Sequence, residues 1–258
     1  MPLEFVGRSL ALSTTGMGAA TSALSVNAAE IWTVFHVETS GCGFLADRRP
    51  PILFERHIFS RLTNHRFDTS DFSDPQPGGY GPSGANQYLR LANAIRSDRA
   101  AALQSASWGL AQIMGSNFAQ AGFADPESMV AAMSDSEDKQ LLAFVAFLQA
   151  NRFDRHLRAH DWASLAQGYN GPNFAVNRYD TRLAQAFAQF SNGPLPDLDV
   201  RAAQLYLTFA GMKPGPVDGT MGSRTKSALL SYQQQQGLPQ TGRVDTATLA
   251  FLAPVAPS

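Results

Sequence analysis

Hydrophobic residues recur at helical spacing along most of this chain. One predicted helix face carries residues at i, i+3, i+4 and i+7: Ile31, Val34, Phe35 and Glu38. A later helix opens at 134–137, and its predicted apolar face consists of Leu141, Leu142, Val145 and Leu148. Strand-like segments are sparse, and 51–54 is the best candidate. The pattern therefore predicts a mainly α-helical protein with a small strand and loop region.

Residues that cap or break helices divide this pattern into segments. Gly41 and Gly43 end the first helix, as glycine beyond a C-cap does. The Asp-Pro-Glu sequence at 125–127 combines an N-cap residue, an N1 proline and a first-turn acid. Asp161 is predicted to cap a further short helix. The segment 64–88 is predicted to be a long loop, which in a compact domain is more often functional than idle.

A stronger break separates two predicted domains. The stretch 191–197 contains two prolines and a glycine, and a new helix starts near Asp199. The predicted organisation is a large domain over 1–192, a linker at 193–198 and a small domain over 199–258.

Composition excludes several classes of function. Hydrophobic residues make up 44% of the chain, which suits a globular protein with a core. The net charge is −1, so neither nucleic-acid binding nor electrostatic attachment to a membrane is expected. No apolar run approaches the ~18 residues that span a bilayer. Glu4 and Arg8 interrupt any leader-like segment, so we expect synthesis in the cytosol. We also expect a monomer.

Neither a metal nor another cofactor is expected. Cys42 is the only cysteine, which rules out a disulfide within the chain. His156 and His160 have i,i+4 spacing, but no ligand motif accompanies them. A solvated helix face explains this pair better than a metal site.

Elimination among the six glutamates leaves two candidates for acid chemistry. Four have structural explanations, either a terminal position or a place near a helix start: Glu4, Glu30, Glu127 and Glu137. Glu38 and Glu55 remain.

Glu38 is predicted to lie at the C-terminal end of its helix, where the dipole disfavours negative charge by ~0.3–1 kcal/mol. It also continues an apolar face. Both effects favour the protonated form and raise the expected pKa, as a general acid for glycosidic cleavage requires. The alternative is a partly exposed glutamate at a helix end with no catalytic role.

Glu55 is followed by Arg56 and His57. Flanking basic residues suit an ionised carboxylate, which is the role complementary to a protonated Glu38. The alternative is a structural ion pair with Arg56 or Arg61.

Four motifs stand in order along the first domain. The segment 37–44 (VETSGCGF), a glutamate followed by a small hydroxyl residue and glycine, resembles the catalytic motif of the lysozyme-like superfamily, specifically of the phage N-acetylmuramidase endolysins. The segments 49–57 (RPPILFERH) and 105–115 (SASWGLAQIMG) are similar to the next two signatures, and 168–172 (GYNGP) to a late Tyr-Asn-Gly motif. The catalytic motif departs from the usual Glu-Ser-Gly because Thr39 and Ser40 both precede the glycine.

The resemblance implies roles for particular residues. Glu38 and Glu55 would be catalytic. Gln112 and Tyr169 would hydrogen-bond or stack on a sugar, and Asn170 would orient a sugar or a water. Trp108 is better explained as a core aromatic than as a sugar platform.

Residues 199–252 resemble a three-helix peptidoglycan-binding domain. Pro216 and Asp218-Gly219 predict a tight turn, and Thr246 is predicted to cap the last helix. In the resembling family this module often precedes the catalytic domain, whereas here it follows.

Together the two resemblances imply a muramidase that hydrolyses the β-1,4 bond between N-acetylmuramic acid and N-acetylglucosamine in peptidoglycan. A lytic transglycosylase giving 1,6-anhydro products is the nearest alternative, and a non-catalytic wall-binding protein is a second. An amidase or a peptidase would need a metal-ligand cluster or a Cys/His pair, and neither is apparent in this sequence. The break at 191–197 further predicts that removal of 196–258 leaves a folded, active domain.

Overall fold

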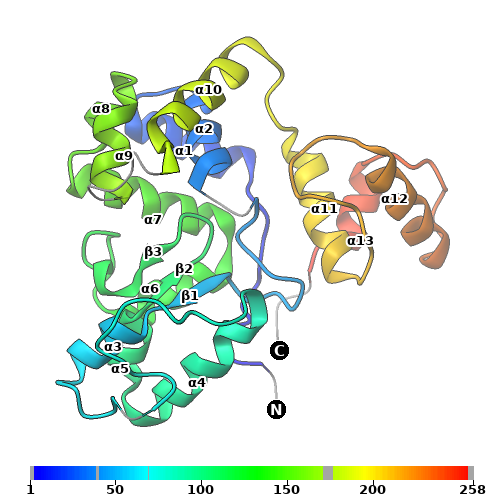
Figure 1. Cartoon of the computed structure of the whole chain (residues 1–258). Helices are drawn as coiled ribbons and strands as arrows, with labels where there is room; N and C mark the ends of the chain where they lie inside the picture. Colours follow the sequence, from blue (N-terminus) through cyan, green and yellow to red (C-terminus); the bar gives the residue numbers. More distant parts are fainter. Residues whose placement is uncertain (1–2, 39–40, 69, 171–176, 255–258) are drawn as a thin grey trace.

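The computed structural model describes residues 3–38, 41–68, 70–170 and 177–254, and Glu38 and Asn170 by their backbone alone. Figure 1 shows a larger helical body that contains a small sheet, with a three-helix unit beside it. Within the larger body, helix α7 lies between a group of helices on one side and the sheet with its covering helices on the other. The predicted architecture, a mainly α-helical domain with a small strand region followed by a three-helix unit, is confirmed.

Helices α1 (Thr14–Leu24) and α2 (Ala28–Glu38) open the larger body. Ser13 caps α1 by accepting a hydrogen bond from the backbone N–H of Gly16. The apolar face predicted for α2 is confirmed, because Ile31, Val34 and Phe35 are buried. This face packs against α10 (Tyr179–Asn192).

Helix α7 (Glu137–Ala150) begins at the end of the predicted opening at 134–137, and its N-cap residue is Ser136. Its buried face includes Leu141, Val145 and Leu148. The prediction for Leu142 is wrong, because this side chain is 41% exposed. Consecutive residues lie about 100° apart around a helix, which turns Leu142 away from the face that Leu141 buries.

The small sheet has three antiparallel strands in the order β1 (Ile52–Phe54), β2 (Ala106–Trp108) and β3 (Ile113–Met114). Leu53 pairs with Ser107, and Ser107 pairs in turn with Met114. The predicted strand at 51–54 is confirmed, whereas β2 and β3 are too short for alternation to reveal them.

Further helices and the loops between them complete this part of the body. They are α3 (Arg56–Leu62), α4 (Gln87–Ser97), α5 (Arg99–Gln104), α6 (Pro126–Asp135) and the 3₁₀ turns η1 (Gly84–Asn86) and η2 (Gly115–Asn117). As predicted, Asp125 caps α6 with Pro126 at its first position. Between α3 and η1 the described chain is irregular, as expected for a long loop.

Helices α8 (Asp154–Arg158) and α9 (Trp162–Asn170) correct the prediction for the two histidines. Helix α8 ends before His160, which takes a positive φ of 53° and stacks on Trp162. His160 also bonds Glu30 (2.9 Å), and His156 bonds Asp161 (3.1 Å). The two histidines therefore do not share a solvated helix face.

The C-terminal unit consists of α11 (Leu198–Phe209), α12 (Ser223–Gln235) and α13 (Thr246–Leu252). The predicted turn is confirmed: the buried Gln204 accepts hydrogen bonds from the backbone N–H groups of Asp218 and Gly219. The predicted cap of α13 is wrong, because Asp245 rather than Thr246 accepts from the N–H of Thr248. Thr246 is already the first helical residue.

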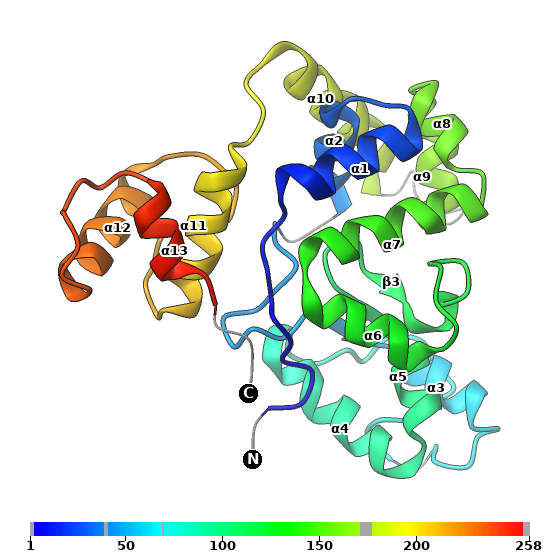
Figure 2. The same ribbon diagram turned by 180° about the vertical axis from the view of Figure 1, so that it is seen from behind.

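The C-terminal unit lies against the larger body near the loop that follows α2, as the front and rear views agree (Figures 1 and 2). Its core includes Ala11 and Phe44 of the larger body. Among the described helices, none combines the length and hydropathy that crossing a bilayer requires.

Candidate active site

Glu38 is the last residue of helix α2. The preceding carbonyl, that of Val37, accepts a hydrogen bond from Nη2 of Arg182 on α10 (3.1 Å). The main chain that carries Glu38 is therefore held from two helices. The side chain of Glu38 lies outside the described residues.

Glu55 follows β1 directly and occupies the N-cap position of α3 without making a side-chain cap. Its backbone N–H donates to the carbonyl of Ser105 (2.8 Å), which ties it to the start of β2. The side chain is 16% exposed. Its Oε2 atom is buried and lies 3.2 Å from His57 Nδ1, in an alignment too poor for a hydrogen bond.

The environment of Glu55 raises the pKa of its carboxyl group, because burial disfavours the charged form. The charge of His57 and a hydrogen bond from Tyr80 lower the pKa and offset this only in part. The alternative that Glu55 pairs with Arg56 is not supported, since Arg56 donates to Asp74 (2.7 Å).

Tyr80 is a neighbour of Glu55 that sequence reasoning did not identify. It lies in the long irregular segment before η1, is 40% exposed, and has a pKa raised by its own burial and by Glu55. Only the clustering of Pro and Gly there, which marks a functional loop, pointed to this segment.

Gln112 lies in the turn between β2 and β3 with a positive φ of 50°. Its carboxamide accepts from Ser107 Oγ (2.9 Å) and donates to the carbonyls of Pro51 (3.1 Å) and Gly109 (2.8 Å). These contacts bind the turn to the residue that precedes β1. The side chain of Gln112 therefore holds the turn against the start of β1.

Tyr169, on α9, reaches the same turn. Its hydroxyl donates to the carbonyl of Ala111, and its ring packs edge-on against Phe144 (5.8 Å between centroids). Gln112 and Tyr169 thus meet at adjacent residues of one turn. The side chain of Asn170 lies outside the described residues. Trp108 is fully buried and donates to the carbonyl of Leu103 (3.0 Å), which confirms it as a core residue.

Comparison with known proteins identifies the family of this chain. A family model described as N-acetylmuramidase matches residues 27–191. The chain belongs to the N-acetylmuramidase family. A second model, a putative peptidoglycan-binding domain, matches residues 196–252. No curated protein matches the chain significantly.

A solved structure, that of a Burkholderia AP3 phage endolysin, is similar to this muramidase with a TM-score of 0.65. The two sequences are 39% identical, and the match covers 70% of this chain and 71% of the other. The muramidase is thus an endolysin-like glycoside hydrolase that acts on peptidoglycan, and the transglycosylase alternative is not favoured. All five predicted site residues fall within the muramidase match.

Proposed function

We propose that Glu38 and Glu55 form the acid and the carboxylate partner of this muramidase. The observation that carries the proposal for Glu55 is its largely buried carboxyl group at the end of β1, with one oxygen lacking a hydrogen bond among the described residues. A structural carboxylate of this burial would be fully hydrogen-bonded. The proposal for Glu38 rests on its place at the end of α2 within the muramidase match.

Glu38 donates its proton to the glycosidic oxygen between N-acetylmuramic acid and N-acetylglucosamine as the C–O bond breaks. Positive charge then develops at the sugar carbon, and the Glu55 carboxylate stabilises it or activates a water that attacks it. A separation of ~6.5–9.5 Å between the two carboxyl groups leads to inversion, and ~5–5.5 Å leads to retention.

Gln112 and Tyr169 support the substrate through the turn between β2 and β3. The carboxamide of Gln112 is engaged by Ser107, Pro51 and Gly109, so its contribution is the position of the turn. Tyr169 fixes the carbonyl of Ala111 in the same way. Asn170 is the residue of this set proposed to contact a sugar or a water directly.

The test of this mechanism is product analysis of the Glu38→Gln variant on purified sacculi. Loss of a positioned proton donor is expected to lower turnover by ~10²–10⁴-fold. Glu127→Gln is the matched control, because Glu127 lies on the surface and pairs with Arg99 (2.5 Å). Wild-type products carrying a reducing end, identified by mass spectrometry, support hydrolysis; anhydro products, or near-normal turnover of Glu38→Gln, contradict the proposal.

The domain division is also a proposal, with 1–192 as the muramidase domain, 193–198 as the linker and 199–258 as the wall-binding domain. Helix α10 ends at Asn192 and α11 begins at Leu198, which supports it. Synthesis in the cytosol and a monomeric state are predictions from the sequence.

A further inference from the structure

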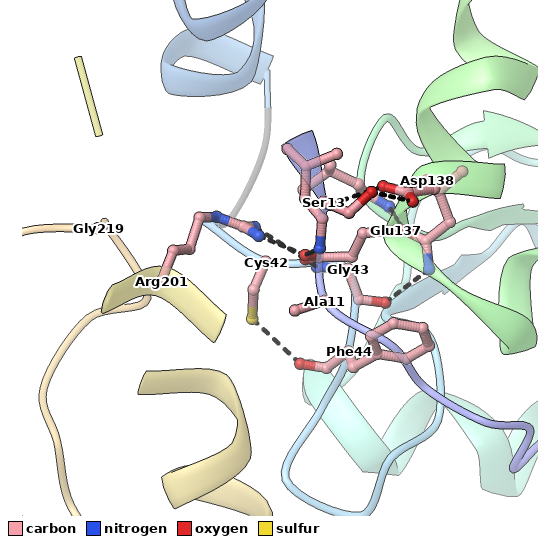
Figure 3. A network of polar contacts seen from close by, with 12 residues as sticks. Ala11, Ser13, Cys42, Gly43, Phe44, Glu137, Asp138, Arg201 and Gly219 are labelled. Atoms are coloured by element: carbon pink, nitrogen blue, oxygen red, sulfur yellow. Dashed lines mark hydrogen bonds and ion pairs between the residues drawn. The ribbon is translucent and has the colours of Figure 1, made fainter. Parts of the chain in front are cut away.

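An ion pair between the two domains is completely removed from solvent. Arg201, on α11 of the wall-binding domain, donates from Nη1 and Nη2 to the two carboxylate oxygens of Glu137, the first residue of α7. The side chains are 1% and 0% exposed, respectively. Figure 3 shows the Arg201 side chain reaching from α11 toward the start of α7. A bidentate pair of this kind fixes direction as well as distance.

The same two side chains hold the loop that follows α2. Nη2 of Arg201 also donates to the carbonyl of Gly41 (2.9 Å), and Glu137 accepts from the N–H of Gly43 (2.7 Å). Gln140, one turn along α7, donates to the carbonyl of Gly43 (2.9 Å). The main chain at 41–43 is therefore bonded to Arg201, Glu137 and Gln140.

Apolar and aromatic contacts show that the two domains are packed together here. Phe44 lies in the core of the wall-binding domain, with its ring centroid 6.4 Å from that of Phe209. The hydroxyl of Tyr206 accepts from the N–H of Ala11 (2.9 Å). The guanidinium of Arg201 also lies over the ring of Trp32 on α2, 5.9 Å from its centroid.

We propose that Arg201 is a positioning residue for the muramidase reaction, supplied by the wall-binding domain. Through Trp32 it contacts α2, and through Gly41 it holds the loop that follows α2, so that Glu38 is positioned between two points that Arg201 contacts. The inference rests on the proposed role of Glu38. A general acid acts only within hydrogen-bonding reach of its target, and a shift of ~1 Å can lower the rate ~10²-fold.

The experiment compares full-length Arg201→Met, Arg201→Lys and wild type on soluble glycan chains too short to need wall anchoring. Arg201→Met is expected to lower kcat ~10–100-fold while KM changes little, because geometry and not binding is altered. Arg201→Lys keeps the positive charge but not the bidentate guanidinium, so its kcat should lie between those of wild type and Arg201→Met. Arg243→Met, at an exposed arginine of the same domain, is the matched control and should leave kcat unchanged.

A double variant, Glu137→Met with Arg201→Met, separates positioning from folding. It leaves no buried charge uncompensated and is expected to fold better than Arg201→Met alone. Its kcat is expected to stay low, because Gly41 loses its hydrogen bond from Arg201 and Gly43 loses its hydrogen bond to Glu137. A folded double variant with wild-type kcat on short chains would overturn the proposal and show that the pair only docks the domains. Glu38→Gln is assayed in parallel: if it is inactive while the double variant is normal, this inference alone fails, and if Glu38→Gln is active, the proposed function itself fails.

Discussion

Glu137 and Glu55 occupy similar places in the chain but opposite electrostatic environments. Each stands at the start of a helix, Glu137 as the first residue of α7 and Glu55 as the N-cap residue of α3. Burial by itself favours a higher pKa for both carboxyl groups. For Glu137 the charge of Arg201 and the hydrogen bonds from Arg201, Gly43 and Leu12 outweigh burial, so its pKa is lowered. For Glu55 burial prevails and the pKa is raised.

The difference lies in how completely each carboxylate is partnered. Glu137 receives two hydrogen bonds from Arg201 and two from backbone N–H groups, so every favourable site on its oxygens is used. Glu55 has one buried oxygen without a well-aligned donor among the described residues. Complete partnering is typical of a structural acid, and incomplete partnering with a perturbed pKa is typical of a functional one.

The largest expected effect is on turnover in Glu55→Gln. If Glu55 is the catalytic carboxylate, activity on sacculi should fall by ~10²–10⁴-fold. The free energy of unfolding should stay the same or increase, because a buried charge with incomplete partners is removed. Steady-state rates and urea unfolding of the same preparation measure both quantities. Lost stability with retained activity per folded molecule would place Glu55 with Glu137 as a structural acid.

The next largest expected effect is a loss of unfolding free energy in Arg201→Met. Removal of one partner leaves Glu137 buried and uncompensated, which typically costs ~3–5 kcal/mol of unfolding free energy. The exposed control Arg243→Met should change it by less than ~0.5 kcal/mol. Urea unfolding followed by tryptophan fluorescence and by circular dichroism measures the difference. Deletion of the wall-binding domain also removes Arg201 from Glu137. We therefore expect the remaining muramidase domain to be destabilised, in contrast to the prediction from the sequence that it folds independently.

As pH falls, Glu55 should be protonated first, and the contact between the domains should loosen only at lower pH, where Glu137 is protonated. Because the pKa of Glu137 is lowered from its ordinary value of 4.5, its contribution to stability is complete above that value and is lost as pH falls through the lowered pKa. Glu55 has the opposite sign, since its contribution is complete below 4.5 and is lost as pH rises through the raised pKa. The unfolding free energy is measured from about pH 2 to 7 in wild type and in the Glu137→Met, Arg201→Met double variant. The pH dependence of the two proteins should differ mainly on the acid side. Equal acid sensitivity of the two proteins would contradict this assignment.

The smallest effect is a shift of the pH–rate profile in His57→Gln. The charge of His57 lowers the pKa of Glu55, so its removal should move the acid limb of kcat/KM to higher pH. Tyr80→Phe should move the limb in the same direction by removing a hydrogen bond. His65→Gln, at an exposed histidine paired with Asp68 (2.9 Å), is the control and should leave the limb in place. An unmoved limb in both His57→Gln and Tyr80→Phe would show that Glu55 does not control the acid side.

Local sequence determined most of the secondary structure, because the relevant interactions are local. The helical spacing of Ile31, Val34 and Phe35 and the caps at Asp125 and Ser136 act within a few residues of each other. The motif at 37–44 likewise led to the muramidase family without knowledge of the fold. Errors occurred where neighbours compete, as when Asp245 rather than Thr246 caps α13.

Tertiary structure alone decided which acids are partnered and by what. Glu137 was explained from sequence by the dipole of its own helix, but its partner Arg201 lies 64 residues away in the other domain. Tyr80 approaches Glu55 only because the loop before η1 folds back toward the end of β1, whereas His57 is its neighbour along the chain. Burial and long-range charge set the pKa of a carboxyl group, and both depend on distances in space that spacing along the chain does not encode.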